Sequence, residues 1–266
     1  MTAAAALDER STLARPDLAE QALEGLVRAR AYRATVPMHG RFGVADIQAD
    51  VDTASARVDQ LLFGEAFDVL ERRGDRVWGR ARRDGVVGWM DSTDLEPGAP
   101  LATHRVSTTS AALPLNALIH HAFPGLTGVD LAAVGAFETD PVAVAERLLG
   151  VPHSLGARSS LATDCSGLVQ QALYACGLAG PRHSDLQSEL GEAVDRADLR
   201  RGDLVVWLAA ADDTRWTGHS ALAMDGERVI HATGHHGAVV VEDLAEADAR
   251  YRADDFAAPV FRRLRQ

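Results

Sequence analysis

Residues 163–177 read TDCSGLVQQALYACG, and this stretch decides the fold of the second half of the chain. Apolar residues recur at helical spacing from Leu168 to Cys176, and Gly177 is a typical residue to end a helix. The pattern therefore predicts a helix that begins near Cys165. Free backbone N–H groups at that end of a helix lower the pKa of a thiol and can stabilise an oxyanion beside the sulfur. Cys165 is thus a candidate nucleophile.

Cys176 lies at the other end of the same predicted helix, on its apolar side. The negative end of a helix disfavours a thiolate, so we interpret Cys176 as a thiol packed in the core. Buried free cysteines are common, and Cys165 taken alone could equally be one of them. The chemistry of Cys165 therefore depends on whether a base lies nearby.

Residues 218–232, GHSALAMDGERVIHA, contain two histidines and predict a hairpin around an Asp-Gly turn. With a three-residue loop at 224–226, His219 faces His231, and opposed residues have Cβ atoms roughly 4.5–5.5 Å apart. One imidazole could then accept the thiol proton while the other orients it. A two-residue turn would shift the register and separate them. Alternatively, each histidine is a partly buried polar residue, or the two bind a metal, although no third ligand follows at zinc-like spacing.

The rest of the chain divides into segments of different periodicity. Helical spacing at 17–33 predicts an N-terminal helical segment within 1–40. Residues 41–98 alternate with a period of two and contain tight turns, which predicts a small β-barrel. Residues 99–138 form a linker or a reduced second unit of that kind. The last segment, 139–266, has helices followed by strands, an α+β order. The strands expected within the barrel are 44–47, 66–70, 77–81 and 86–90.

Charge and composition argue against several classes of partner. The 266 residues include 27 basic and 38 acidic side chains, a net charge of −11, which repels nucleic acid and anionic membrane surfaces. We see no signal peptide and no apolar stretch of the roughly 18 residues that a spanning helix needs. Two cysteines do not make a disulfide framework, which suits a reducing compartment. We therefore expect a cytoplasmic protein without nucleic-acid or membrane partners, with non-classical export left open.

Five elements of the second half, in this order, resemble the NlpC/P60 family of papain-like cysteine peptidases. They are DCSGLVQ at 164–170, PRHSDLQ at 181–187, RGDLVVW at 201–207, His219 in its strand, and IHA at 230–232. The resemblance implies a papain-like α+β domain over 139–266, without cofactor or metal. It implies Cys165 as nucleophile, His219 as general base and His231 as the group that orients the base.

The strands and turns of 41–98 resemble a bacterial SH3-like domain. An SH3-like domain joined to an NlpC/P60 domain is similar to the bacterial γ-D-glutamyl-L-diamino acid endopeptidases, which cleave peptidoglycan stem peptides. That similarity implies a small murein peptide with a free N-terminal L-alanine as substrate, and a role in cell-wall recycling. It matches Asp164, Ser166 and Ser184 to substrate-binding positions. It also matches Glu65 to an SH3 carboxylate that binds the substrate amine.

Two positions depart from the family pattern. His153 stands where relatives usually have a tyrosine credited with oxyanion support, and Val86 stands where they often have a tyrosine that helps to bind the amine. His153 either donates a hydrogen bond to the oxyanion, as a substrate-binding residue, or fills space. Two other functions therefore stay open. One is an amidase or acyltransferase acting on another acyl or γ-linked substrate, and the other is a non-catalytic peptide-binding protein with a degenerate peptidase fold.

Overall fold

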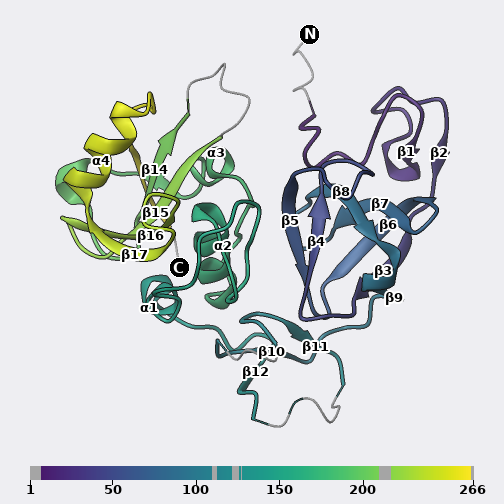
Figure 1. Ribbon diagram of the computed structural model, residues 1–266, viewed down its shortest axis with the longest axis horizontal. Helices are drawn as coiled ribbons and strands as arrows, with labels where there is room; N and C mark the ends of the chain where they lie inside the picture. Colours follow the sequence, from purple (N-terminus) through teal and green to yellow (C-terminus); the bar gives the residue numbers. More distant parts are fainter. Residues whose placement is uncertain (1–6, 110–112, 122–125, 127, 210–216, 265–266) are drawn as a thin grey trace. The chain divides into compact units, whose positions relative to one another are not determined.

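The computed structural model describes residues 7–109, 113–121, 126, 128–209 and 217–264. Residues 1–6, on which the expectation about a signal peptide rests, lie outside this range. The chain divides into two units, Met1–Thr103 with Ala117–Phe123, and His104–Asn116 with Pro124–Gln266 (Figure 1). In the described part, every helix is too short or too polar to cross a membrane.

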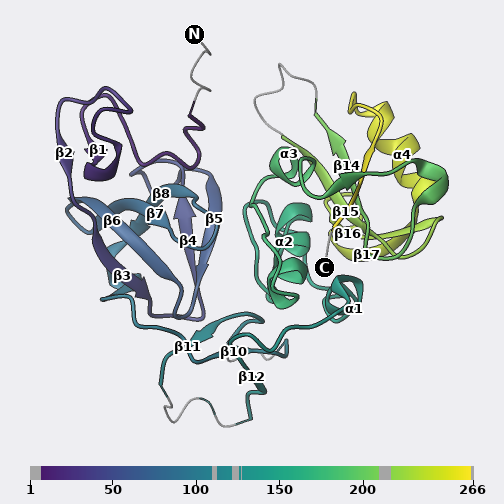
Figure 2. The same cartoon turned by 180° about the vertical axis from the view of Figure 1, so that it is seen from behind.

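The first unit contains a seven-stranded antiparallel sheet (Figure 2). Alternate side chains of its strands form a core that includes Ile47, Leu61, Phe67 and Met90. In pairing order the strands are β5 (Arg57–Leu62), β4 (Val44–Gln48), β8 (Val87–Asp91), β7 (Arg76–Ala81), β6 (Ala66–Arg73), β3 (Val36–Gly40) and β9 (Leu95–Pro97). The four strands predicted from the alternation correspond to β4, β6, β7 and β8, while β3, β5 and β9 were not predicted.

The predicted N-terminal helix at 17–33 is wrong. The segment forms β1 (Ala19–Glu20), the 3-10 turn η1 (Gln21–Leu23) and β2 (Tyr32–Arg33), with β1 and β2 parallel. The apolar residues expected on one buried face do not share it, because Leu18 is buried whereas Leu26 is 74% exposed. Gly25 has a φ of +84°, which interrupts a right-handed helix.

Contacts with the sheet explain why this segment is extended. Leu13 and Leu18 pack against Trp78 and Trp89, and the guanidinium of Arg15 lies 4.0 Å from the centre of the Trp78 ring. Such a cation–π contact and the burial of two leucines favour a strap laid over the tryptophans. Tertiary packing therefore outweighs the local helical periodicity.

The segment 99–138 is divided between the two units. Its described residues include three short strands: β10 (His104–Val106), β11 (Leu118–Ile119) and β12 (Leu131–Ala133). β10 pairs antiparallel with β12 in the second unit, while β11 belongs to the first.

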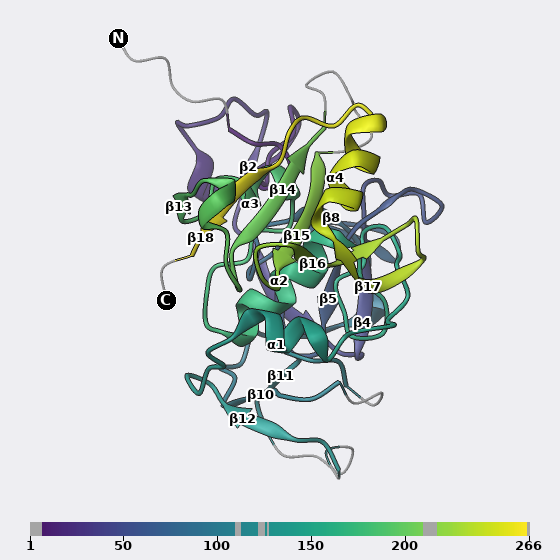
Figure 3. The same cartoon turned by 90° about the vertical axis from the view of Figure 1, so that its left-hand side faces the viewer.

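The second unit has a six-stranded sheet with helices on both faces (Figures 1 and 3). The predicted order of helices followed by strands is confirmed. The helices are α1 (Pro141–Glu146), α2 (Cys165–Ala175), α3 (Ser184–Gln187) and α4 (Leu244–Ala253). In pairing order the strands are β13 (Glu192–Ala193), β18 (Val260–Arg263), β14 (Leu204–Leu208), β15 (Gly218–Ala223), β16 (Arg228–Thr233) and β17 (Ala238–Asp243).

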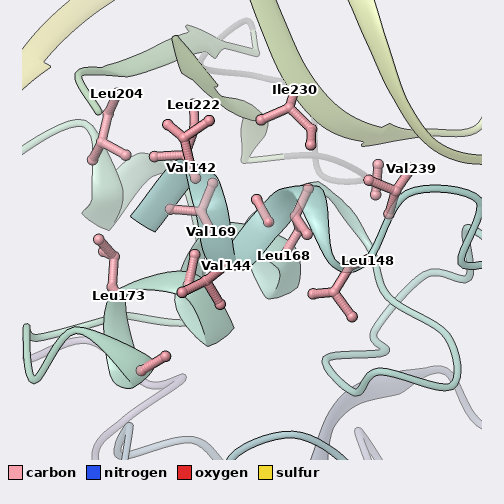
Figure 4. Packing of buried hydrophobic residues seen from close by; sticks show 14 of the residues in the cluster. Val142, Val144, Leu148, Leu168, Val169, Leu173, Leu204, Leu222, Ile230 and Val239 are labelled. Carbon is pink, nitrogen blue, oxygen red and sulfur yellow. The ribbon is translucent and has the colours of Figure 1, made fainter. Parts of the chain in front are cut away.

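Strand alternation gives this sheet two separate apolar faces. Leu204 and Val206 of β14 pack with α1 and α2, in the cluster drawn in Figure 4. Val205 and Trp207, the alternate residues, pack instead with α4. The sheet is therefore buried on both sides, with α2 and α4 on opposite faces (Figures 1 and 3).

The predicted register of the histidine hairpin is wrong by two residues. Leu222 pairs with Ile230, so His219 is not directly opposite His231. The loop is longer than expected because the Asp225 carboxylate accepts hydrogen bonds from the backbone N–H groups of the two residues that follow Gly226. A shift of two residues keeps both histidines on the same face of the sheet. They are therefore diagonal neighbours, which is still within reach of long side chains.

Candidate active site

Cys165 is the first residue of α2, as the sequence predicts. Asp164 caps the helix by accepting a hydrogen bond from the Gly167 N–H at 2.8 Å. The Cys165 side chain is partly exposed, and its Sγ lies 3.8 Å from the hydroxyl oxygen of Ser184. The backbone of Ser220 also hydrogen bonds with the sulfur. The thiol therefore lies next to β15, one residue from His219.

His219 and His231 are joined through their rings. Nε2 of His219 lies 3.0 Å from Nδ1 of His231, and the ring planes are nearly perpendicular. The structure records pairing between β15 and β16 only at positions 222 and 223 of β15, beyond His219. With Nε2 of His219 taken up by His231, Nδ1 is the ring nitrogen that remains to accept a proton from a thiol.

Helix α4 adds polar and aromatic groups that the sequence did not reveal as site residues. The Tyr251 ring stacks on His219 at 4.2 Å between centroids, and its hydroxyl oxygen lies 2.9 Å from Nε2 of His219. Glu242, at the end of β17, has a carboxylate oxygen 2.9 Å from Nε2 of His231. Arg250 binds both oxygens of Glu242. His219 and His231 thus belong to a larger polar cluster.

Two family models match this chain. The model described as the bacterial dipeptidyl-peptidase SH3 domain matches residues 49–95, and the NlpC/P60 family model matches residues 150–255. The chain carries a bacterial SH3 domain followed by an NlpC/P60 domain. The second match includes Cys165, His219 and His231, so the polar cluster lies within the NlpC/P60 domain.

Curated relatives of this chain are named as peptidases. The murein DD-endopeptidase MepS/murein LD-carboxypeptidase of Escherichia coli K12 is 34% identical over 92 residues, which are 34% of this chain and 47% of that protein. The chain thus spans about half the length of this relative. The γ-D-glutamyl-L-lysine dipeptidyl-peptidase of Bacillus subtilis 168 is 26% identical over 225 residues, which are 70% of this chain and 76% of that protein.

A solved structure has the same fold over most of the chain. An NlpC/P60 family protein from Bacillus cereus superposes with a TM-score of 0.67 at 17% identity, over 85% of this chain and 99% of that one. The likeness extends beyond the NlpC/P60 domain itself.

The resting thiol and imidazole of the NlpC/P60 domain are both neutral. Burial, reinforced by the negative charge of Asp164, raises the pKa of Cys165 to about 11. Burial and the neighbouring His231 hold the pKa of His219 well below its usual value of 6.5. Burial and the charge of Asp164 therefore outweigh the lowering of the thiol pKa expected from the helix start. The Asp164 carboxylate already occupies the helix start, and its charge opposes a thiolate.

Asp164 and Ser166, predicted to bind substrate, are both bound to Arg182. The guanidinium contacts the two Asp164 oxygens at 3.0 and 2.6 Å, and one of its nitrogens donates to the Ser166 hydroxyl at 2.8 Å. Asp164 also accepts from the Gly156 N–H at 2.9 Å. Burial opposes the charge of Asp164, but Arg182 and these N–H groups outweigh it and hold its pKa below 3.8. Both residues thus form part of the internal scaffold around the nucleophile.

Ser184 and His153, the other predicted substrate-binding residues of this domain, lie near the cluster. Ser184 is buried beside the sulfur of Cys165. His153 is half-buried and pairs through its backbone with Thr163, two residues before the nucleophile. Burial lowers the pKa of His153, and the neighbouring Asp164 opposes that shift. His153 is thus held near the site as a neutral ring.

Glu65 lies in the first unit and is fully buried, not a surface residue. One of its oxygens accepts from Arg83 at 2.7 Å, and the other accepts from the Leu62 N–H at 3.0 Å. The carboxylate that was expected to bind a substrate amine is therefore already paired with a cation of the same unit. As for metals, the described residues do not group three or more suitable ligands in a metal-binding cluster.

The neutral thiol predicts the pH dependence of Cys165 alkylation. Below a pKa of about 11, the thiolate fraction rises about tenfold per pH unit, so labelling by iodoacetamide should accelerate steadily from about pH 7 to pH 9. Peptide mass mapping separates Cys165 from Cys176, whose pKa burial also raises to about 11. A labelling rate already maximal at about pH 6 would instead show a thiolate–imidazolium pair and contradict this assignment.

The Asp164–Arg182 pair predicts a large loss of stability in Arg182→Leu. Removing one partner of a buried pair leaves the other charge unpaired, so the free energy of unfolding should fall by about 3–5 kcal/mol. In the wild type, the lowered pKa of Asp164 stabilises the fold above pH 3.8, and this contribution is lost as the pH falls through the folded pKa. The deficit of the variant, measured by urea denaturation, should therefore shrink at acidic pH.

Arg201→Leu is the matched control, because Arg201 is 40% exposed in its pairs with Asp140 and Glu146. Its expected loss is at most about 1 kcal/mol. Equal losses in the two variants, or a deficit of Arg182→Leu that does not change with pH, would refute the role given to Asp164.

Proposed function

We propose that this protein is a cysteine endopeptidase that hydrolyses the γ-D-glutamyl-L-diamino acid bond of peptidoglycan stem peptides. The observation that carries the proposal is the position of Cys165 at the start of α2, beside the strand of the paired His219 and His231. The relative from Bacillus subtilis supports the choice of bond, because its name specifies a γ-D-glutamyl-L-lysine linkage and the similarity covers 70% of this chain.

In the proposed mechanism, His219 is a general base toward a neutral thiol. As the sulfur of Cys165 attacks the γ-carbonyl carbon of D-glutamate, its proton passes to Nδ1 of His219. The resulting imidazolium then protonates the leaving amine of the diamino acid, and the C–N bond breaks. A water molecule, deprotonated by the same imidazole, hydrolyses the thioester and regenerates the thiol. Backbone N–H groups near the start of α2, together with His153, are the proposed donors to the oxyanion.

Substrate binding is proposed to involve Ser184 beside the nucleophile and Glu65 in the SH3 domain. Asp164 and Ser166 would then contribute by holding the start of α2 rather than by touching the peptide. The amine of a free N-terminal L-alanine would replace Arg83 as the partner of Glu65. Such a pairing selects for a free N-terminus, because a capped peptide leaves a charge unpaired. Free murein peptides in the cytoplasm, released during cell-wall recycling, are the proposed substrates.

A second candidate keeps the nucleophile and changes the bond. The relative from Escherichia coli, which is named for murein DD-endopeptidase and LD-carboxypeptidase activities, is 34% identical over 92 residues. The pairing of Glu65 with Arg83 also favours this alternative, because it reduces the affinity that Glu65 would have for an amine. Products of different mass separate the two candidates.

The decisive test is mass spectrometry of L-Ala-γ-D-Glu-diaminopimelate after incubation with wild type and with Cys165→Ala. Only the wild type should release L-Ala-γ-D-Glu, and the variant should lose more than about 10³-fold in rate because no other group can form the thioester. Cys176→Ala is the matched control and should retain activity. The N-acetylated peptide should be cleaved more slowly, and Glu65→Gln should remove that difference.

Cleavage of the peptide by Cys165→Ala at the wild-type rate would refute the proposal. Release of a different product by the wild type, for example after cleavage of a D-Ala–diaminopimelate cross-link, would favour the second candidate. No product from folded wild type on either substrate would favour an acyltransferase or a peptide-binding protein.

A further inference from the structure

Glu242 lies next to the histidine pair but outside the predicted set of site residues. Its side chain is 8% exposed, and its Oε2 lies 2.9 Å from Nε2 of the fully buried His231. Its position at the end of β17 follows from the sheet register, in which His231 pairs with Val240. The backbone therefore places the carboxylate at the far end of a row of contacts that runs from His219 through His231.

The ring protons of the two histidines determine whether His219 can act as a base. If Nδ1 of His219 is to accept a proton, the ring must carry its own proton on Nε2. That Nε2–H then donates to Nδ1 of His231, 3.0 Å away, which must be unprotonated. The proton of His231 consequently lies on its Nε2, the ring nitrogen 2.9 Å from Glu242 Oε2. The reversed pair of tautomers would place a proton on Nδ1 of His219 and block the reaction.

A carboxylate 2.9 Å from Nε2 of His231 favours a proton on that nitrogen, because its oxygens are negatively charged and have no proton to donate. Arg250 keeps Glu242 ionised: its Nη2 lies 2.6 Å from Oε2, and its Nη1 contacts Oε1. Although burial opposes the charge, Arg250 and His231 hold the pKa of Glu242 far below its usual value. The remaining titratable groups around the pair are His236, 3.8 Å from Glu242 Oε1, together with His153, Cys165, Asp164 and Tyr251.

Tyr251 is consistent with the same tautomer of His219. Its hydroxyl donates to Oγ1 of Thr233 at 3.2 Å, and a tyrosine has one hydroxyl proton to give. The oxygen that lies 2.9 Å from Nε2 of His219 is then an acceptor, which requires a proton on that nitrogen. Two acceptors, from β16 and α4, thus converge on the same N–H.

We propose that Glu242 is a positioning residue that fixes the tautomers of His231 and His219 and thereby leaves Nδ1 of His219 free to deprotonate Cys165. The effect of Glu242 on catalysis rests on the proposed function, in which His219 acts as the base. The tautomers themselves are independent of the substrate. During attack the proton moves from Sγ to Nδ1 of His219, and the Nε2–H of His219 and the Nε2–H of His231 stay in place.

The test compares Glu242→Ala with Glu242→Gln. Both variants lose the negative charge, but only glutamine keeps an acceptor. Its amide oxygen should occupy the Oε2 position, which lies close to both Arg250 Nη2 and His231 Nε2, whereas Oε1 is contacted by Arg250 Nη1. The matched control is Glu246→Ala, which removes an exposed acidic side chain from the first turn of α4.

Two-bond ¹H–¹⁵N correlation spectra of ¹⁵N-histidine-labelled protein report each tautomer directly, with signals assigned from His219→Gln and His231→Gln. Wild type, Glu246→Ala and Glu242→Gln should show protons on Nε2 of both rings, and Glu242→Ala should show mixed tautomers. Glu242→Ala should also lose about 10- to 100-fold in kcat for the murein peptide, with most of the loss restored in Glu242→Gln.

Wild-type tautomers in Glu242→Ala would overturn the proposal, as would equal spectra and equal rates for Glu242→Ala and Glu242→Gln. A wild-type spectrum with a proton on Nδ1 of His219 would also overturn it. If the wild type cleaves no murein peptide, the proposed function fails, whereas the spectra still decide the role of Glu242.

Discussion

The buried carboxylate of Asp164 holds together three segments that are distant in the sequence. It caps α2 through the Gly167 N–H, accepts from the Gly156 N–H in the preceding loop, and forms a bidentate pair with Arg182 in the segment before α3. The cap fixes where the helix starts and therefore where the sulfur of Cys165 lies. The segment that contains Arg182 also carries Ser184, which contacts that sulfur.

The same carboxylate has an electrostatic consequence for the nucleophile. A negative charge on the residue before Cys165 raises the thiol pKa and offsets the positive end of the helix. The proposed catalysis by this cysteine thus needs a base that is neutral at rest. His219, the proposed base, is neutral because burial lowers its pKa.

The two faces of the second sheet pack against different helices. Residues of β14 and β15 that face α2, such as Leu204 and Leu222, form the apolar core beneath the helix that begins at Cys165. Alternate residues face α4 and include Trp207, whose ring lies against both His219 and Tyr251. The helix that begins at Cys165 and the helix whose Tyr251 stacks on His219 are therefore packed on opposite sides of one sheet. A shift of one residue in any of these strands would exchange the faces and separate the site.

The sequence predicts those parts of the fold and site that depend on local patterns. The helix that starts at Cys165 follows from its periodicity, and the strands around Trp78 and Trp89 follow from alternation. The predicted helix at 17–33 is wrong because contacts with those tryptophans, distant in sequence, stabilise an extended strap.

The other differences between the predicted and observed site arise from contacts between residues that are distant in the sequence and from side-chain hydrogen bonds to the backbone. The hairpin register depends on Asp225, whose carboxylate lengthens the turn. Tyr251 and Glu242 meet the histidines only through strand register and the packing of α4, which no local pattern specifies. The position of Cys165 at a helix start does not specify its thiol pKa, because burial and the charge of Asp164, the capping residue, raise it.

The most direct test of Cys165 as the nucleophile is rapid-quench mass spectrometry of the protein mixed with L-Ala-γ-D-Glu-diaminopimelate. A covalent intermediate should appear within the first turnover as an L-Ala-γ-D-Glu adduct on the peptide that contains Cys165, and it should disappear as the dipeptide is released. Hydrolysis without any adduct on Cys165, or with an adduct on another residue, would contradict nucleophilic catalysis by this thiol.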